Sequence, residues 1–240
     1  MKRDTIDLSL ILPVHNEEDI IEPVFKQIKN TLDELSIRYE VILVENGSID
    51  ASLAVIKRFA KKSRNTHALV SSKGYGSAII KGLSAAKGTY VCYMPSDGQV
   101  DLKVLPKLWE TIRNGKWDVV KIKRESRESL IRLFVSNMYS LINIILFGIP
   151  YWDINGDPRI FLRKKLALLH LVYKDSFIDT EFAVKAHRLN WKIYEIPAKT
   201  LPRAGGISTR NIMTFTEFFK NLCVFKFGEK LKKWKNSLRK

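Results

Sequence analysis

The strongest constraint on the fold of this chain is an alternation of short apolar segments with longer amphipathic ones. Apolar, β-branched and aromatic residues dominate five segments of strand length, at residues 6–14, 39–44, 67–71, 89–94 and 117–122. A helical pattern of apolar residues follows each of the first four segments. Strands that alternate with helices at this spacing predict a single α/β domain with a doubly wound, mostly parallel sheet.

The fourth segment is the most informative, because it ends abruptly in polar residues. Residues 89–94 carry no charge, and Pro95 then begins a turn that contains Asp97 and Gln99. The carboxyl end of a central strand is where such folds bind ligands. In an extended turn, side chains two residues apart face the same side, and oxygen ligands of this kind suit Mg²⁺ or Mn²⁺ bound to substrate phosphates. A plain surface turn is the alternative, since Asp and Gly are common turn residues.

Positive charge is the strongest bulk feature of the chain. Lys and Arg number 41 against 25 Asp and Glu, which gives a formal net charge of +16. Residues 220–240 alone contain eight basic residues and one acidic residue. Such an excess favours an anionic partner, which is nucleic acid, anionic lipid or a phosphorylated substrate.

Two features bear on the cellular compartment. Cys92 and Cys223 both lie in apolar surroundings, which predicts no disulfide and is usual in a reducing compartment. The apolar segment at residues 6–14 runs directly into charged residues without a small-residue cleavage site, so we expect a first strand and not a signal peptide.

Two stretches suggest contact with a membrane surface. Residues 129–152 are strongly apolar at helical spacing, but Arg132 and Asn143 are among the polar interruptions that argue against a spanning helix. An interfacial helix with Arg132 at the level of the headgroups and a helix buried in the core both remain open. Residues 211–240 predict a basic amphipathic tail, whose aromatic residues among lysines favour anionic lipid. RNA would suit the same composition, but no nucleic-acid motif accompanies it.

Three common motifs are incomplete and do not define a function. Gly74-Tyr75-Gly76 lacks the third glycine of the dinucleotide fingerprint, because Ile79 stands in its place. Residues 82–89 end in Lys-Gly-Thr and not in the Gly-Lys-Thr of a phosphate-binding loop. The four histidines show no metal-ligand spacing with one another.

Six motifs, in their order and spacing, resemble those of family 2 glycosyltransferases. They are Leu12-Pro13-Val14-His15-Asn16-Glu17-Glu18, Val44-Glu45-Asn46-Gly47-Ser48-Ile49-Asp50, Gly74-Tyr75-Gly76-Ser77-Ala78, Pro95-Ser96-Asp97-Gly98-Gln99, Asp153-Ile154-Asn155-Gly156-Asp157-Pro158-Arg159 and Arg203-Ala204-Gly205-Gly206-Ile207-Ser208. The last two resemble elements of the dolichol-phosphate mannose synthase-like subgroup. The resemblance implies a glycosyltransferase A-type domain at residues 1–210. Its 6–100 half would bind the nucleotide-sugar and its 101–210 half the acceptor, followed by the tail at 211–240.

The resemblance also implies a role for individual residues. The nucleotide would be bound by Pro13, His15, Glu17, Glu45, Asn46, Lys73 and Gly76. The divalent metal on the diphosphate would be bound by Asp97 and Gln99. The catalytic residues would be Asp97, Arg124 and Arg203, with Arg124 meeting the acceptor phosphate. The acceptor would be bound by Arg132, Asp153, Arg159, Asp179, Glu181 and Ser208.

The chain departs from the family pattern at three places. Pro95 replaces the first Asp of the metal motif, Glu45-Asn46 replaces an Asp-Asp pair, and Asp157-Pro158 replaces Gly-Phe. A diphosphate and water can supply the remaining oxygen ligands of a metal. A catalytically inactive homologue that binds the membrane surface is therefore an alternative to an enzyme.

The chemistry of the acceptor separates two enzymatic interpretations. A polyprenyl phosphate is already ionised and needs cationic clamping, which Arg provides through bidentate contacts. A polysaccharide or lipid hydroxyl would need a carboxylate base, for which Asp179 and Glu181 are candidates. The Gln-x-x-Arg-Trp element of many hydroxyl-glycosylating relatives is absent from the sequence.

The resulting prediction is an inverting enzyme that moves one sugar from a nucleotide-diphospho-sugar to a polyprenyl phosphate, such as a dolichyl or undecaprenyl phosphate. We expect it to be cytoplasmic and peripherally associated with the inner face of the membrane. Its predicted partners are the donor, the lipid acceptor and the membrane surface, with an integral-membrane protein as a further option and no nucleic acid.

Overall fold

The computed structural model describes residues 5–125, 130–150, 153–202 and 212–238, and the side chains of residues 130–135 and 212–219 are not described. Seven strands form one sheet in the order β3-β2-β1-β4-β6-β5-β7. The strands are β1 (Leu8–Val14), β2 (Tyr39–Glu45), β3 (Thr66–Val70), β4 (Tyr90–Tyr93), β5 (Val119–Arg124), β6 (Arg159–Leu162) and β7 (Ile193–Ala198).

The sheet is mostly parallel, as the sequence predicts. Among the described strands, β6 is antiparallel to both of its neighbours, β4 and β5, and every other pairing is parallel. Six strands therefore have their carboxyl ends at one edge of the sheet. Strands β6 and β7 were not predicted, because residues 123–200 show no regular alternation of strand and helix patterns.

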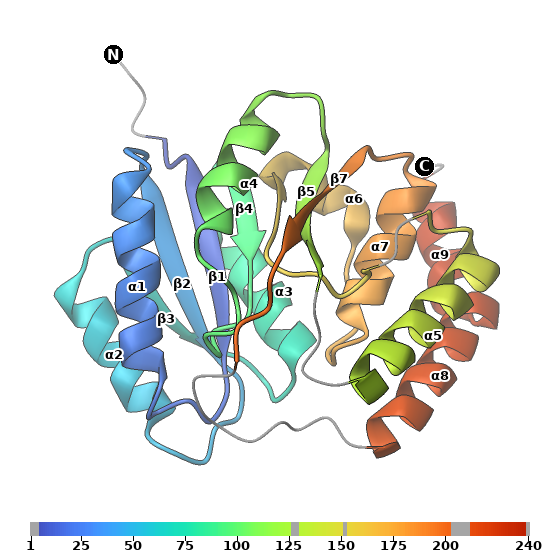
Figure 1. The fold of residues 1–240 in the computed structure, drawn as a ribbon, viewed down its shortest axis with the longest axis horizontal. Coiled ribbons are helices and arrows are strands. Elements are labelled where there is room, and N and C mark those ends of the chain that lie inside the picture. The colour runs from blue at the N-terminus through green and yellow to red at the C-terminus, as the bar shows by residue number, and fades with distance from the viewer. Residues whose placement is uncertain (1–4, 126–129, 151–152, 203–211, 239–240) are drawn as a thin grey trace.

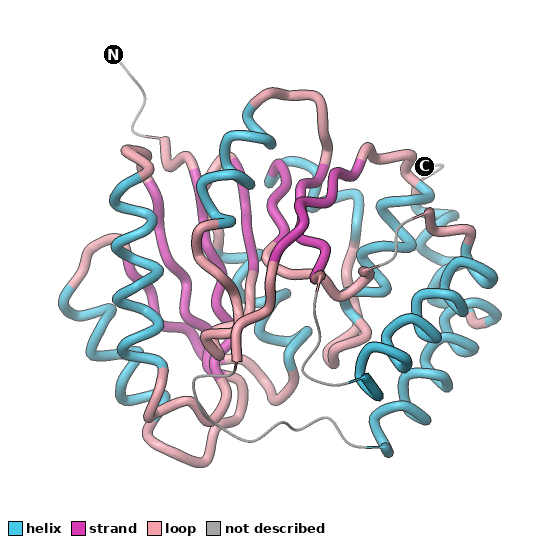
Figure 2. The backbone as a smooth tube through the Cα atoms, in the orientation of Figure 1, coloured by secondary structure: helices cyan, strands magenta, loops and turns pink. Residues whose placement is uncertain are grey.

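Helices cover both faces of the sheet, which forms a continuous layer between them (Figures 1 and 2). The helices α1, α2 and α4 pack on one face, and α3 and α5 to α9 pack on the other. The helices are α1 (Ile21–Glu34), α2 (Ser52–Lys62), α3 (Tyr75–Ala85), α4 (Val104–Arg113), α5 (Leu130–Phe147), α6 (Leu166–Leu169), α7 (Ile178–Arg188), α8 (Ile212–Phe227) and α9 (Glu229–Ser237), with a 3₁₀ turn at Arg163–Lys165.

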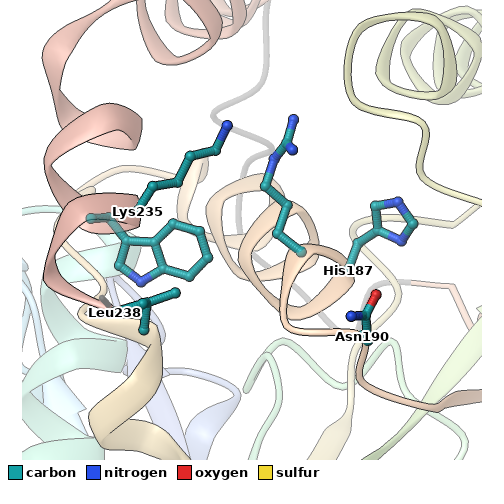
Figure 3. A pocket seen from close by; sticks show the side chains of 6 residues that line it. His187, Asn190, Lys235 and Leu238 are labelled. Carbon is teal, nitrogen blue, oxygen red and sulfur yellow. The ribbon is translucent and has the colours of Figure 1, made fainter. Parts of the chain in front are cut away.

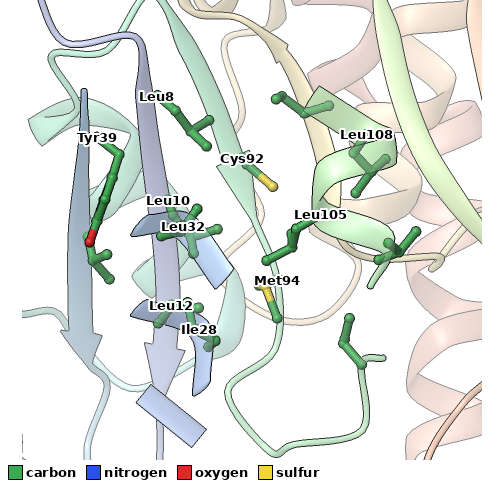
Figure 4. Packing of buried hydrophobic residues seen from close by; sticks show 14 of the residues in the cluster. Leu8, Leu10, Leu12, Ile28, Leu32, Tyr39, Cys92, Met94, Leu105 and Leu108 are labelled. Atoms are coloured by element: carbon green, nitrogen blue, oxygen red, sulfur yellow. The ribbon is translucent and has the colours of Figure 1, made fainter. Parts of the chain in front are cut away.

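The central strands explain the continuous apolar segments of the sequence. Every residue of β1 and β2 is buried, because helices cover both faces of these strands. Leu10 and Leu12 of β1 point toward Ile28 and Leu32 of α1 (Figure 4). The buried residues of α1 recur at intervals of three and four, which is the stripe expected for a helix packed on a sheet.

Helix α5 has a buried face and an exposed face. The buried face contains a polar residue, and the exposed face contains apolar ones. Asn143 is fully buried, and its Nδ2 donates to the Tyr139 carbonyl at 2.8 Å. Three of the apolar side chains point outward, with Met138 and Leu141 each 42% exposed and Ile145 72% exposed. One local hydrogen bond thus satisfies the amide nitrogen of a buried polar residue, whose Oδ1 has no partner among the described residues, while part of the apolar stripe faces solvent. No helix within the described residues is long and apolar enough to cross a membrane.

The C-terminal tail packs on the rest of the domain. Leu222 and Phe225 of α8, with Leu231 and Trp234 of α9, are buried in the same cluster as α3 and α7. The indole Nε1 of Trp234 donates to the Leu168 carbonyl at 2.9 Å. Of the aromatic residues that suggested a membrane anchor, Phe225 and Trp234 are therefore part of the core, whereas Phe227 is exposed.

Candidate active site

The loops after β1 and β2 form one polar wall at the carboxyl edge of the sheet. The backbone N–H of Asn46 and its Nδ2 both donate to the Val14 carbonyl, at 3.1 and 2.9 Å. The Asn16 N–H donates to Ser48 Oγ at 3.1 Å, and its Oδ1 accepts from the Ile49 N–H at 2.9 Å. The structure thereby brings together the predicted nucleotide-binding segments around residues 13–17 and 45–46.

The individual carboxylates of this wall make protein contacts of their own. Glu45 is buried, and its Oε1 accepts from the Ser48 N–H. Glu17 Oε2 lies 2.5 Å from Ser96 Oγ, and this hydroxyl also contacts the Pro13 carbonyl. Ser96, to which the sequence analysis assigned no role, therefore ties the turn after β4 to the loop after β1.

One ring nitrogen of His15 differs from the other polar atoms of this wall in its hydrogen bonding. Its Nδ1 is buried and has no hydrogen-bond partner among the described residues. A buried polar atom without a partner is costly unless a ligand or water satisfies it. This marks His15 as the member of the wall that is best suited to meet a ligand.

The turn after β4 carries the predicted metal ligands. Asp97 Oδ1 accepts from the Gln99 N–H at 3.1 Å, and Gly98 has a φ of 75°, so both side chains belong to one tight turn. The Leu201 N–H donates to the Gln99 carbonyl at 2.9 Å, and Val100 pairs with Thr200. The segment that follows β7 is therefore attached directly beside this turn.

The side-chain oxygens of this turn suit a metal ion that is bound jointly by the protein and a substrate. Within the part of the chain that the structure describes, no group of three His, Cys, Asp or Glu side chains could hold an ion by itself. Mg²⁺ is commonly bound by one or two carboxylates together with substrate phosphates, and Mn²⁺ also favours oxygen ligands. Asp97 and Gln99 fit that arrangement.

Lys73 and Gly76 lie at the start of α3. A Cβ on Gly76 would stand 2.3 Å from the Tyr173 carbonyl oxygen, so only glycine fits against this backbone. The Ser77 N–H donates to the Lys174 carbonyl at 3.0 Å, which holds the same two segments together. The exposed Lys73 lies beside Gly47 of the wall, where its Cβ and Cγ are the nearest side-chain atoms.

Arg124 and Asp153 form the central pair of the predicted acceptor half. Asp153 accepts three hydrogen bonds from Arg124, from the backbone N–H at 2.8 Å, from Nε at 2.9 Å and from Nη2 at 2.7 Å. Burial opposes the charge of Arg124, but the bonds to Asp153 outweigh it and raise its pKa. Asp153 binds the edge of the planar guanidinium that is formed by Nε and Nη2. The edge formed by Nη1 and Nη2 offers a second pair of donors, which suits bidentate binding of an anion.

A buried ion cluster lies next to this pair. Arg159 is fully buried, and its guanidinium contacts Asp157 Oδ1 at 2.6 Å and Asp179 Oδ1 at 3.0 Å. Tyr75 donates to Asp157 at 3.3 Å and Tyr93 to Asp179 at 3.3 Å, and burial raises the pKa of both tyrosines. The cluster joins β4, β6, α3 and α7, so its first effect is to hold the two halves together.

The structure assigns Glu181 a place away from the predicted acceptor contact. Its side chain is fully buried and accepts from the N–H groups of Val172 and Tyr173, each at 2.9 Å, and from Lys185 Nζ at 2.6 Å. A carboxylate occupied in this way supports the loop at 170–173 and is not placed to act as a base. The sequence could not show this, because the loop and the helix position meet only in the folded chain.

Three predicted residues cannot be placed. Arg203 and Ser208 lie outside the described residues, and Arg132 lies in the early part of α5 with an undescribed side chain.

A separate hollow of about 510 Å³ lies far from these groups (Figure 3). His187 and Asn190 line it from the end of α7, with Lys235 and Leu238 from the end of α9. Because Asp179 lies at the opposite end of α7, this hollow does not belong to the candidate active site.

The fold is a doubly wound α/β domain whose polar groups gather at the carboxyl edge of the sheet, where such folds bind ligands. Residues 9–168 match the model of glycosyl transferase family 2, and the chain belongs to this family. The predicted membership of family 2 is thereby confirmed.

Similar proteins carry related names. A protein of Synechocystis named an uncharacterized glycosyltransferase is 28% identical over 196 residues, covering 80% of this chain and 61% of that protein. Undecaprenyl-phosphate 4-deoxy-4-formamido-L-arabinose transferase of Edwardsiella ictaluri is 27% identical over 211 residues, covering 86% and 63%. The enzyme of that name from Proteus mirabilis is 31% identical over 176 residues, covering 71% and 54%. The chain thus spans roughly three-fifths of the length of these relatives.

Solved structures show the same fold. Glucosyl-3-phosphoglycerate synthase from Mycobacterium tuberculosis, in complex with phosphoglyceric acid, superposes with a TM-score of 0.70 at 17% identity, over 93% of this chain and 81% of that one. Its complex with Mn²⁺, uridine diphosphate and phosphoglyceric acid has a TM-score of 0.67 at 17% identity, over 91% and 76%. At this identity the likeness extends to the fold alone.

Proposed function

We propose that this chain transfers one sugar from a nucleotide-diphospho-sugar to the phosphate of a polyprenyl lipid, with inversion at the anomeric carbon. Membership of family 2 supports the transferase activity, and relatives named for undecaprenyl phosphate support the acceptor. The observation that carries the acceptor is the Arg124–Asp153 pair at the end of β5. Strands β4 and β5 run in the same direction, so this pair lies at the same sheet edge as Asp97.

The wall formed after β1 and β2 would bind the nucleoside of the donor. Pro13, His15, Glu17, Glu45 and Asn46 surround this edge, and the partnerless Nδ1 of His15 is a ready hydrogen-bonding atom for a base or ribose. Lys73, exposed beside the wall, would face the diphosphate. Gly76 acts indirectly, by letting the 173–175 backbone pack under the start of α3.

Asp97 and Gln99 would hold a divalent cation together with the diphosphate. Such a cation, when bound, neutralises the negative charge that develops on the departing nucleoside diphosphate. The residues of the chain then orient that leaving group. Ser96 fixes the turn to the loop after β1, and the Leu201 contact fixes it to the segment after β7.

On the acceptor side, Arg124 would present its second guanidinium face to the lipid phosphate. The phosphate is ionised at neutral pH, so its oxygen attacks the anomeric carbon without a general base. Arg132, Arg203 and Ser208 would contribute further contacts to the phosphate. Asp153 would orient Arg124, and the Arg159–Asp179 pair would form the buried base of the phosphate site.

A lipid acceptor places the protein at a membrane surface, and α5 and α8 provide a suitable face. Their outward apolar residues are Met138, Leu141, Ile145, Val224 and Phe227, of which Phe227 is 79% exposed. The two helices lie side by side (Figure 1). Nearby lysines, including the exposed Lys220, would favour anionic lipid. We therefore propose peripheral association with the cytoplasmic face of the membrane.

The test is transfer of radiolabel from a panel of nucleotide-sugars to undecaprenyl or dolichyl phosphate, with Mg²⁺ or Mn²⁺ present. The proposal expects label in a lipid that mild acid releases, since a glycosyl phosphate is acid-labile. An acid-stable product would indicate a hydroxyl acceptor instead. No transfer with any donor, in protein that still binds liposomes, would favour the inactive homologue.

A further inference from the structure

Lys121 is a buried cation at the centre of the acceptor half. It lies on β5, where Arg159 of β6 and Glu195 of β7 are its register partners on either side. Its side chain is 3% exposed. Burial lowers the pKa of Lys121, and the nearby Glu195 and Asp153 oppose that shift.

Three acceptors surround its ammonium group. The Nζ donates to Glu195 Oε1 at 2.9 Å, to the Ile122 carbonyl at 3.2 Å and to the Asp153 carbonyl. An ammonium has three hydrogens, so these contacts satisfy it fully. Removing one partner of such a buried pair is strongly unfavourable, because it leaves the other charge or polar groups without compensation.

The contacts of Lys121 fix the turn that carries Asp153. The Gly156 N–H donates to the Asp153 carbonyl at 3.0 Å, and a Cβ on Gly156 would stand 2.1 Å from the Ile122 carbonyl oxygen. Lys121 thus binds the two carbonyls that position this turn against β5. The carboxylate of the same Asp153 binds Arg124 through three hydrogen bonds.

We propose that Lys121, anchored by Glu195, is a positioning residue for Arg124. Lys121 fixes the backbone of Asp153, and Asp153 fixes the guanidinium edge that is presented to the acceptor phosphate. The residue acts on acceptor binding and leaves donor binding unaffected. This inference rests on the proposed function for its kinetic consequence, but the link from Lys121 to Arg124 is structural.

Lys185 provides a matched control. It is 2% exposed, and its Nζ donates to a carboxylate, Glu181, at 2.6 Å and to a backbone carbonyl, His170, at 2.8 Å. It lies on α7 and supports the 170–173 loop, not the turn at 153–156. Lys185→Met therefore removes the same chemistry from a comparable depth without acting on Arg124.

The kinetic test compares Lys121→Met, Glu195→Gln and Lys185→Met in the full chain. We expect Lys121→Met to raise the KM for polyprenyl phosphate about tenfold, since hydrogen bonds to charged groups have effects of this order. Glu195→Gln, which keeps an acceptor for the lysine, is expected to raise it less. The KM for the nucleotide-sugar stays within about twofold of the wild-type value. Equal acceptor KM values for Lys121→Met and Lys185→Met would overturn the proposal.

A second measurement needs no substrate. Thermal unfolding of Lys121→Met, Arg124→Met and the double variant forms a mutant cycle, with Lys185→Met replacing Lys121→Met in the control cycle. We expect the Tm losses to be non-additive in the first cycle and additive in the second. Additive losses in both cycles would disprove the link. If Lys121→Met fails to fold, Glu195→Gln takes its place in both experiments. Wild-type protein that transfers no sugar to the lipid would disprove the proposed function, while the cycle would still decide the role of Lys121.

Discussion

The predicted donor half, residues 6–100, and the predicted acceptor half, residues 101–210, hold their polar groups in different ways. In the donor half, loops after parallel strands are tied by backbone N–H groups, amides, hydroxyls and single carboxylates, as between Asn16 and Ser48 and between Glu45 and Ser48. In the acceptor half, buried ion pairs hold the segments together. They are the Arg124–Asp153 pair and the Arg159 cluster. A single hydrogen bond contributes little to the free energy of unfolding, whereas breaking a buried ion pair leaves a buried charge without compensation. The acceptor half should therefore be the more sensitive of the two to single substitutions.

The largest expected effect on stability is at Arg159. Arg159→Met leaves Asp157 and Asp179 buried without their cation, so the free energy of unfolding should fall by about 3–5 kcal/mol. Urea denaturation of the purified variant measures this. Arg163→Met, at an exposed arginine that donates to the Gly88 carbonyl, is the control and should lose less than about 1 kcal/mol. Similar losses in both variants would remove the contrast between the halves.

The next effect concerns activity and lies on the donor side. Asp97→Ala should lower turnover by about 10²–10³-fold, because the leaving diphosphate loses electrostatic stabilisation. Asp101→Ala, two residues beyond Gln99, is the control for local damage, because Asp101 Oδ1 accepts only from the start of the next helix in the described contacts. Steady-state rates with and without EDTA measure both variants. An unchanged rate in Asp97→Ala would exclude a metal role for this residue.

A smaller loss is expected where the halves touch. Gly76→Ala would push a methyl group into the Tyr173 carbonyl, which should cost about 1–3 kcal/mol of stability through overpacking. Gly115→Ala is the matched control, since nothing lies within 4 Å of its added methyl group and only its φ of 69° opposes the change. Thermal unfolding of the two variants separates contact from backbone strain. A Tm of Gly76→Ala equal to that of the wild-type protein would show that the 173–175 backbone yields freely.

The smallest effect concerns the outer face of the acceptor half. Ile145→Glu should weaken binding to anionic liposomes by about tenfold, because burial of one large apolar side chain contributes about 1.5–3 kcal/mol. Val70→Glu changes a similarly exposed residue on β3, the strand at the other end of the sheet, and should leave binding unaltered. Co-sedimentation measures the bound fraction. Deletion of residues 212–240 is a poorer test, because Leu222 and Phe225 belong to the core.

Much of the donor half could be predicted, because its elements follow one another in sequence. Residues 6–14 and 39–44 predicted strands that the structure places at Leu8–Val14 and Tyr39–Glu45. The turn at Asp97 and Gln99 was evident from a polar break after an uncharged strand. The hydrogen-bond partners of the residues around this turn could not be predicted from the sequence. Ser96 contacts Glu17 across 79 residues of sequence, and no local pattern indicates such a contact.

The sequence by itself determined the alternation of strands and helices, the polar turn after the fourth strand and the membership of family 2, because each depends on local spacing or on ordered motifs. Only the tertiary structure decided which charges meet. It placed β6 antiparallel between β4 and β5, buried the side chain of Asn143 on α5, and joined Lys121, Asp153 and Glu195 across three segments. A buried charge is stable only beside its partners, and those partners come together only when distant strands pair.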